Sequence, residues 1–172
     1  MEENTMMMNR AVLAGLSSPR LDPRENADET SMEELCDLLE TAGGVCVGET
    51  LQNLKAPDSR TFIGTGKVEE LKQLIAVQEA DLAVFDNELS PSQTRALSEE
   101  LGVRVLDRSG LILDIFAQRA KTKEGRLQVE LAQYQYLLPR LTGMWGHLVR
   151  QTASGGSSPI GTRGPGETQL ET

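Results

Sequence analysis

The chain has 172 residues, of which 38% are hydrophobic and 3% aromatic, so it provides for one domain with an aliphatic core or for a small domain with an appendage. No apolar run is long enough to span a bilayer, and residues 1–10 lack a signal-peptide pattern, so we expect a cytoplasmic protein. The net charge of −9 argues against a nucleic-acid partner, but residues 1–116 carry −12 and residues 117–172 carry +3. On charge alone, a solvated acidic domain with an ordinary helical tail is as good an interpretation as a basic binding region.

Residues 1–9 are expected to form a flexible N-terminus, and residues 10–108 to alternate between strands and helices. The predicted strands are 10–16, 45–47, 82–85 and 103–106, with a helix over 68–75 among those between them. The residues that should begin or end helices are Thr30 or Ser31, Gly43 with Gly44, Ser90 with Pro91, and Gly102. This alternation predicts βαβ units and a small, mainly parallel sheet.

Residues 109–172 are predicted to form a helical arm. A single long helix should run over about 111–138, and Pro139 should kink or end it. Its apolar residues recur at spacings of 4, 3, 4 and 3, which is typical of a coiled coil and requires a partner helix. These residues are Leu127, Leu131, Tyr134, Leu138 and Leu141.

A glycine-rich segment over residues 143–166 cannot form a core and predicts a long exposed loop. Residues 167–171 then have the pattern of a second helix, and the sequence stops without a helix stop signal. We therefore expect a cut before most of the partner helix. Within the loop, Arg163 could contact phosphates, as could Arg150 just before it, and Trp145 or His147 could stack on unpaired bases. A flexible tether is the alternative that composition alone leaves open.

Gly64, Gly66 and Lys67 suggest a phosphate-binding loop, but the positions that need Gly and Ser or Thr hold Thr61 and Val68. A tight turn that opens a helix is favoured, with a weak anion site at its N-terminus as the remaining possibility.

Four acids follow or flank the predicted strands, and capping or solvated turns are favoured over metal or acid–base chemistry for them. They are Asp81, Asp86, Asp107 and Asp114. Cys36 and Cys46 are expected to be reduced, buried small hydrophobes, and no metal site is predicted.

Several ordered strings resemble the HflX family of GTPases. They are FIGTGKVEEL (62–71), VFDNELSPSQTR (84–95), RSGLILDIFAQRA (108–120), EGRLQVELAQ (124–133) and GTRGPGETQLET (161–172). The resemblance extends over about residues 10–172.

The resemblance implies an N-terminal α/β subdomain, then two long antiparallel helices, then a Ras-like GTPase domain. Such proteins bind the large ribosomal subunit and split or rescue ribosomes under stress, and the loop between the helices approaches the peptidyl-transferase centre. The expected rRNA-binding residues are Arg140, Arg150, Gln151, Gly155, Gly156, Gly161, Arg163, Gly164 and Gly166. Residues 157–160 make this loop longer than the usual family loop.

The resemblance also implies that GTP and Mg²⁺ bind a missing downstream domain, so we expect no cofactor and no GTPase activity in this fragment. Two other interpretations stay open. One is a second, ATP-type nucleotide site at Gly64, Gly66 and Lys67. The other is a helical oligomerisation module without a role in RNA binding. Because most of the partner helix is expected to be cut off, self-association of the fragment through its long helix is also expected.

Overall fold

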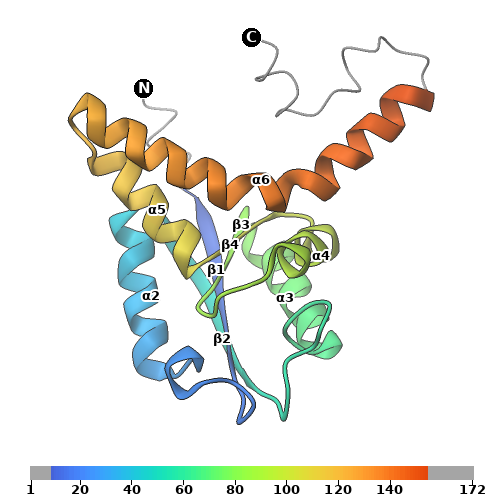
Figure 1. Ribbon diagram of the computed structural model, residues 1–172. Helices are drawn as coiled ribbons and strands as arrows, with labels where there is room; N and C mark the ends of the chain where they lie inside the picture. Colours follow the sequence, from blue (N-terminus) through green and yellow to red (C-terminus); the bar gives the residue numbers. More distant parts are fainter. Residues whose placement is uncertain (1–8, 155–172) are drawn as a thin grey trace.

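The computed structural model describes the backbone of residues 9–154 and the side chains of residues 9–141 (Figure 1). Its sheet has the order β2-β1-β3-β4, with β1 at Arg10–Ser17, β2 at Val45–Asn53, β3 at Leu82–Phe85 and β4 at Arg104–Asp107. Every neighbouring pair of strands is parallel, which confirms the predicted α/β sheet. The helices are η1 (Pro23–Glu25, a 3-10 turn), α2 (Glu29–Thr41), α3 (Thr65–Gln78), α4 (Pro91–Leu101), α5 (Arg108–Arg119) and α6 (Lys123–Ser154).

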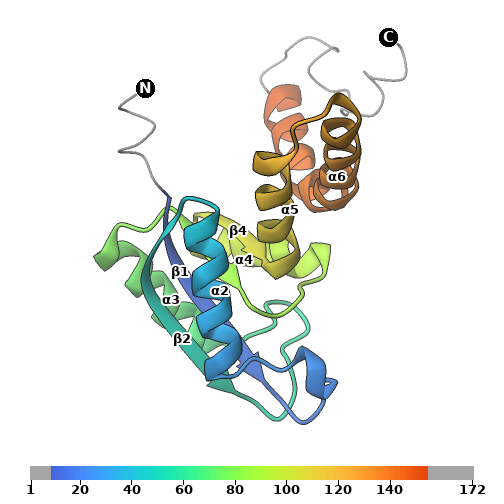
Figure 2. The same cartoon turned by 90° about the vertical axis from the view of Figure 1, so that its left-hand side faces the viewer.

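The sheet lies between two layers of helices, and β1 is its centre. Ala11 and Leu13 face α2 and α5. Val12 and Leu16 face α3 and α4 on the other side of the sheet. This alternation follows from the period of two along a strand, and it buries both faces of the sheet. Figures 1 and 2 show α2 and α3 covering opposite faces, with α5 leading away from the sheet to α6.

Several predicted boundaries need correction at their ends. The strand predicted over 45–47 continues to Asn53, because β2 pairs with the whole length of β1. The helix expected to be capped by Thr30 or Ser31 is capped by Asp28, whose carboxylate accepts the Ser31 amide at 2.7 Å. Ser31 instead completes a capping box by accepting the amide of Asp28 at 2.8 Å.

The predicted start and end of the helix after β3 are confirmed. Ser90 caps α4 and accepts the Gln93 amide at 3.2 Å, with Pro91 at the first helical position. Gly102 ends this helix with a φ of 73°, in the left-handed region that glycine adopts without strain.

The single long helix predicted over 111–138 is wrong. Two helices, α5 and α6, are separated by a turn at Ala120, whose ψ of 124° is extended. The second helix starts there because Thr122 accepts the Gly125 amide at 2.9 Å, as an N-cap residue does.

Pro139 does not end α6, which continues to Ser154. The loop predicted over 143–166 is therefore wrong for residues 143–154, whose backbone is helical. Figure 1 shows α6 changing direction partway along, as expected for a helix with an internal proline. The predicted N-terminus at 1–8, the loop residues 155–166 and the second helix from 167 lie outside the described residues.

The apolar stripe predicted on this helix is exposed along α6. Leu127 is 56% exposed, Leu131 59% and Tyr134 52%, and the two further leucines of the stripe, at 138 and 141, are also exposed.

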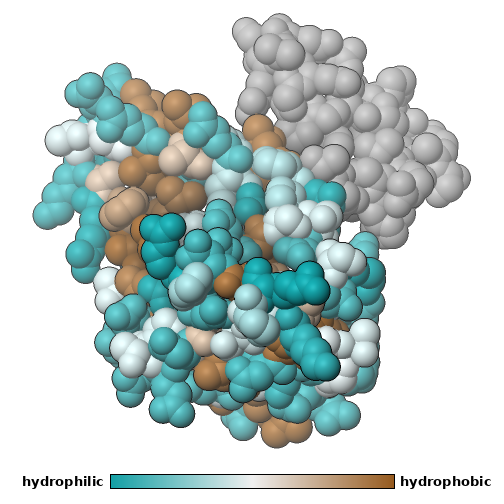
Figure 3. Space-filling view, turned by 60° about the horizontal axis from the view of Figure 1, so that its bottom comes forward, coloured by the Kyte–Doolittle hydropathy of each residue, from teal (hydrophilic) through white to brown (hydrophobic). Residues whose placement is uncertain are grey.

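On the face of the domain turned to the viewer in Figure 3, hydrophilic residues predominate. Within residues 9–154, no helix combines the length and the hydrophobicity needed to cross a bilayer.

Candidate nucleic-acid interface

The arm is attached to the sheet at Asp107, the last residue of β4. Its carboxylate is fully buried and caps α5 by accepting the Gly110 amide at 3.1 Å. The same carboxylate accepts the Leu89 amide at 3.0 Å and the Tyr136 hydroxyl of α6 at 2.6 Å. One buried acid therefore joins β4, α5, the loop before α4 and α6.

Tyr136 brings α6 into close contact with α5. A Cβ atom added to Gly110 would lie 2.7 Å from the Tyr136 hydroxyl oxygen, so only glycine leaves room for the ring there. Burial raises the pKa of the Tyr136 phenol, and the hydrogen bond to Asp107 and the charge of that carboxylate raise it further. The phenol therefore keeps its proton and remains a hydrogen-bond donor to Asp107.

Arg140 completes the attachment one turn later. Its guanidinium lies 3.8 Å from the centre of the Tyr136 ring and donates to the Leu89 carbonyl at 3.1 Å. One of its nitrogens is 3.9 Å from a carboxylate oxygen of Asp107, and its side chain is 13% exposed. Arg95 of α4 donates to the Pro139 carbonyl at 2.5 Å. These contacts fix the middle of α6 on the domain.

The predicted rRNA contact of Arg140 stays a prediction, and it now has a structural condition. Its buried Nε atom has no hydrogen-bond partner within the part of the chain whose side chains are described. Of the remaining nitrogens, one donates to the Tyr136 carbonyl of α6 and the other to the Leu89 carbonyl, so a contact with RNA through these nitrogens competes with bonds that the protein already makes.

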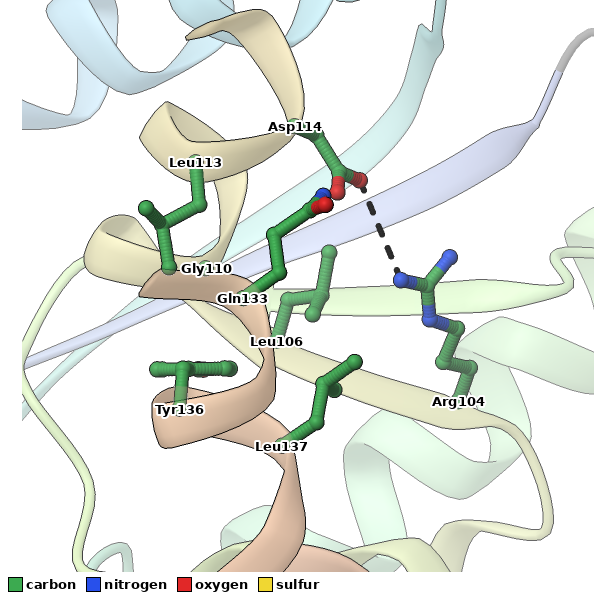
Figure 4. A pocket seen from close by; sticks show the side chains of 8 residues that line it. All are labelled: Arg104, Leu106, Gly110, Leu113, Asp114, Gln133, Tyr136 and Leu137. Atoms are coloured by element: carbon green, nitrogen blue, oxygen red, sulfur yellow. Dashed lines mark ion pairs between the residues drawn. The ribbon is translucent and has the colours of Figure 1, made fainter. Parts of the chain in front are cut away.

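A small cavity of about 20 Å³ remains beside this attachment, between β4, α5 and α6 (Figure 4). Its wall includes an ion pair of 3.8 Å between Arg104 and Asp114, drawn as a dashed line. Burial raises the pKa of Asp114, and Arg104 partly offsets that effect. The cavity has room for about one water molecule, so the helices are closely packed here.

A larger polar cleft of about 330 Å³ lies at the carboxyl ends of β1 and β3. The strand order reverses between these two strands, and open α/β sheets usually bind ligands at such a point. Asp86 forms an ion pair with Arg108 and accepts the Ser31 hydroxyl at 2.6 Å. Arg108 also donates to the Ser31 carbonyl at 2.8 Å. These groups serve as one another's hydrogen-bond and ion-pair partners. They connect the starts of α2 and α5 to the end of β3.

The four acids predicted to cap helices or lie in solvated turns have mixed roles. Asp81 accepts the Arg10 amide at 3.0 Å in an exposed turn, as expected. Asp107 is a cap but is fully buried, and Asp86 and Asp114 have arginine partners. Among the described residues, no group of three or more His, Cys, Asp or Glu side chains could hold a metal ion.

Gly64 is the N-cap residue of α3, which begins at Thr65, and it has extended backbone angles and no side-chain cap; the prediction that this segment opens a helix is therefore confirmed. Lys67 donates to the Thr50 hydroxyl at 3.1 Å and to the Glu70 carboxylate at 3.0 Å. Because its ammonium group already has these partners, the ATP-type alternative gains no support from this loop. The weak anion site predicted at Gly64, Gly66 and Lys67 stays a prediction.

Cys36 and Cys46 are free thiols, but they are half-buried rather than buried as predicted. Both pack at the edge of the apolar cluster between α2 and the sheet. Burial, together with the neighbouring Cys46 and Glu40, raises the pKa of Cys36 to about 11. Both therefore remain small side chains that fill the edge of a core.

Of the other predicted rRNA-binding residues, Arg150 and Gln151 lie on the last turns of α6, where only the backbone is described. Five glycines and an arginine of that prediction lie outside the described residues, namely Gly155, Gly156, Gly161, Arg163, Gly164 and Gly166.

Comparisons with known proteins match almost the whole chain. A family model described as GTP-binding GTPase N-terminal matches residues 29–117, and one described as GTP-binding GTPase Middle Region matches residues 119–172. The chain is 45% identical over 176 aligned residues to GTPase HflX of Flavobacterium psychrophilum, covering 100% of this chain and 40% of that protein. It is 56% identical over 144 residues to GTPase HflX of Alkalihalophilus pseudofirmus, covering 84% of this chain and 33% of that protein. The chain belongs to the HflX family of GTPases.

Membership of the HflX family agrees with the fold. A crystal structure of a GTP-binding protein from Sulfolobus solfataricus in complex with GDP is 28% identical, with a TM-score of 0.60, and covers 80% of this chain and 39% of that one. The chain thus spans about a third to two fifths of the HflX relatives that it matches. The two family models meet in the last turn of α5, just before the turn that leads to α6.

Sequence reasoning misses the attachment of the arm. It assigns Asp107 only as a possible cap and gives Tyr136 no role. The available signal is the apolar and aromatic face of α6 on the side opposite to the leucine stripe. That signal cannot identify Asp107 as the partner, because the two residues are 29 positions apart.

Proposed function

We propose that the chain is the part of an HflX-type GTPase that binds the large ribosomal subunit, in a protein that splits or rescues ribosomes under stress. The observation that carries the proposal is family membership over nearly the whole chain. A second observation supports it. The middle of α6 is fixed to a closely packed domain, so its far end, which carries Arg150, is held away from the sheet.

The proposed RNA contacts are those of the far end of the arm. A rigid attachment is useful there because it removes the freedom that a flexible segment would lose on binding. Arginines next to a glycine-rich backbone suit phosphate oxygens and unpaired bases near the peptidyl-transferase centre. We place GTP and Mg²⁺ outside these 172 residues, and a cytoplasmic location follows from the proposed partner.

The test is cosedimentation of the 172-residue chain with purified large subunits at several salt concentrations. The Arg150→Ala/Arg163→Ala variant should bind more weakly, and its log Kd should depend less steeply on log salt concentration, by about 0.7 to 0.9 for each phosphate that is no longer neutralised. The matched control is Arg20→Ala/Lys55→Ala, which removes two exposed cations from the sheet domain. Equal binding by both variants would contradict the assigned contacts.

Absence of binding by the unaltered chain would contradict the proposed function itself. The purified chain should hydrolyse no GTP above background, since Gly64, Gly66 and Lys67 do not complete a phosphate loop. Measured turnover in the pure chain would overturn that part of the proposal.

A further inference from the structure

The turn between α5 and α6 holds four cations that the proposed function does not use. These are Arg119, Lys121, Lys123 and Arg126, and all four side chains are exposed. One acid, Glu124, lies among them. Residues 9–118 carry 10 basic and 20 acidic residues, so this basic turn stands out from an acidic domain. Its local field is attractive to a polyanion.

Several cations of the sheet domain have a carboxylate partner, which these four lack among the described side chains. Arg60, Lys67 and Arg104 are each within 4 Å of a carboxylate. Within the region where side chains are described, no carboxylate pairs with any cation of the basic turn. Their charges are therefore available to an external partner.

Helix stability does not account for the two cations at the start of α6. Lys123 is the first residue of α6 and Arg126 lies within its first turns, where the positive end of the helix dipole disfavours cations. The turn itself is well ordered, because Thr122 accepts the Gly125 amide and Arg126 donates its amide to the Thr122 carbonyl at 2.9 Å. Lys123 and Arg126 thus lie on a fixed backbone at a helix start where a purely structural role would favour acids, whereas Arg119 lies at the end of α5, where a cation is also favourable to the helix.

We propose that the basic turn, Arg119 to Arg126, is a second RNA-binding surface that contacts the phosphate backbone of the large subunit. This inference rests on the proposed function and extends it to the opposite end of α6. The helix has 32 residues, so its ends are separated by at most about 48 Å at 1.5 Å per residue. Contacts at both ends fix the direction of the arm on RNA, which a single contact cannot do.

The chemistry fits a phosphate backbone better than base-specific recognition. Arginine and lysine offer donors and charge to phosphate oxygens, and the turn has no aromatic residue within 119–126 for stacking on a base. We therefore expect binding that depends strongly on salt and little on RNA sequence.

The test compares two variants that remove the same number of charges. The turn variant is Arg119→Gln/Lys121→Gln/Lys123→Gln/Arg126→Gln, and the control is Arg20→Gln/Arg24→Gln/Lys55→Gln/Lys72→Gln on the exposed surface of the sheet domain. A smaller variant, Lys121→Gln/Lys123→Gln, preserves the bond from Arg126 to the Ala120 carbonyl in case the turn is perturbed. Circular dichroism checks that each variant is folded.

Binding to purified large subunits is measured over a fourfold range of salt concentration. We expect the turn variant to bind more weakly than the control, and its affinity should fall about threefold less over this range for each phosphate that it no longer neutralises. The smaller variant should show the same trend. Equal affinities and equal salt dependence for turn variant and control would overturn this inference and leave the proposed function intact.

Two other results would also overturn it. If the unaltered chain binds no large subunits, the proposed function fails and this inference fails with it, which the wild-type measurement alone reveals. If the turn is needed for binding to phosphatidylglycerol vesicles but not to subunits, its partner is a lipid surface rather than RNA.

Discussion

The sheet domain and the arm are held in place by different forces. Every buried hydrophobic side chain among the described residues lies between Ala11 and Ile115, and α6 contributes none. α6 is held instead by the Tyr136 ring, which packs against the apolar cluster between α2 and the sheet, and by polar contacts of Tyr136 and Arg140 with the end of β4 and the Leu89 carbonyl. Apolar burial therefore dominates in the sheet domain, whereas directional hydrogen bonds have a larger share in positioning α6.

The largest expected effect is on the free energy of unfolding, when one leucine is replaced in the sheet domain and one in the arm. Leu13 is fully buried in β1, and Leu131 is 59% exposed on α6. Leu13→Ala should lower the free energy of unfolding by roughly 2–5 kcal/mol because it leaves a cavity in a packed core. Leu131→Ala should change it by less than about 0.5 kcal/mol. Urea unfolding followed by circular dichroism gives both values, and similar losses would mean that the arm has a core of its own.

A smaller effect is expected at the attachment of the arm. Tyr136→Phe removes the hydroxyl that donates to the buried Asp107 carboxylate, and it should loosen α6 by about 1.5 kcal/mol. Hydrogen exchange should become faster in the α6 amides around this residue and stay unchanged in β1. Tyr134→Phe is the matched control, because that ring is 52% exposed and should leave exchange as it was. Faster exchange in both variants would assign the effect to the helix rather than to the attachment.

The smallest net effect concerns the exposed stripe. Burial of a leucine side chain stabilises by roughly 1.5–3 kcal/mol, but association and ordering costs offset much of this. We expect weak, concentration-dependent self-association of the chain, which Leu127→Glu/Leu131→Glu should abolish. The control, Val77→Glu, alters a residue of α3 that is 76% exposed. Sedimentation equilibrium measures the self-association of the unaltered chain, the stripe variant and the control. An unaltered chain that is monomeric at high concentration would show that the stripe does not mediate self-association.

The residues that predict local structure are those whose effect is local. Ser90 with Pro91 identifies the start of α4, and the apolar run at 82–85 matches β3, because caps and buried strands depend on near neighbours. The break at Ala120 escapes prediction even though Thr122 has the chemistry of a cap, because helix-forming sequence with apolar residues lies on both sides of the turn.

The attachment site could not be predicted in the same way. Leu89 and Arg140 are 51 positions apart, and their contact depends on where β4 ends and how α5 turns the chain. The RNA-binding residues are inferred from the family resemblance, and composition alone does not separate them from a tether. The basic turn is visible in the sequence as four cations in eight residues, but its exposure and its lack of carboxylate partners among the described side chains required the fold.

The position of the attachment along α6 has a mechanical consequence. Tyr136 and Arg140 lie close to the midpoint of Lys123–Ser154, so the helix is supported at its centre with a similar length on each side. Because the helix changes direction partway along, it acts as a bent lever whose fulcrum is the end of β4. A rotation about this point that displaces the basic turn also displaces the opposite end by a comparable distance. If both ends contact RNA as proposed, this helix would couple events at two distant points of one RNA surface.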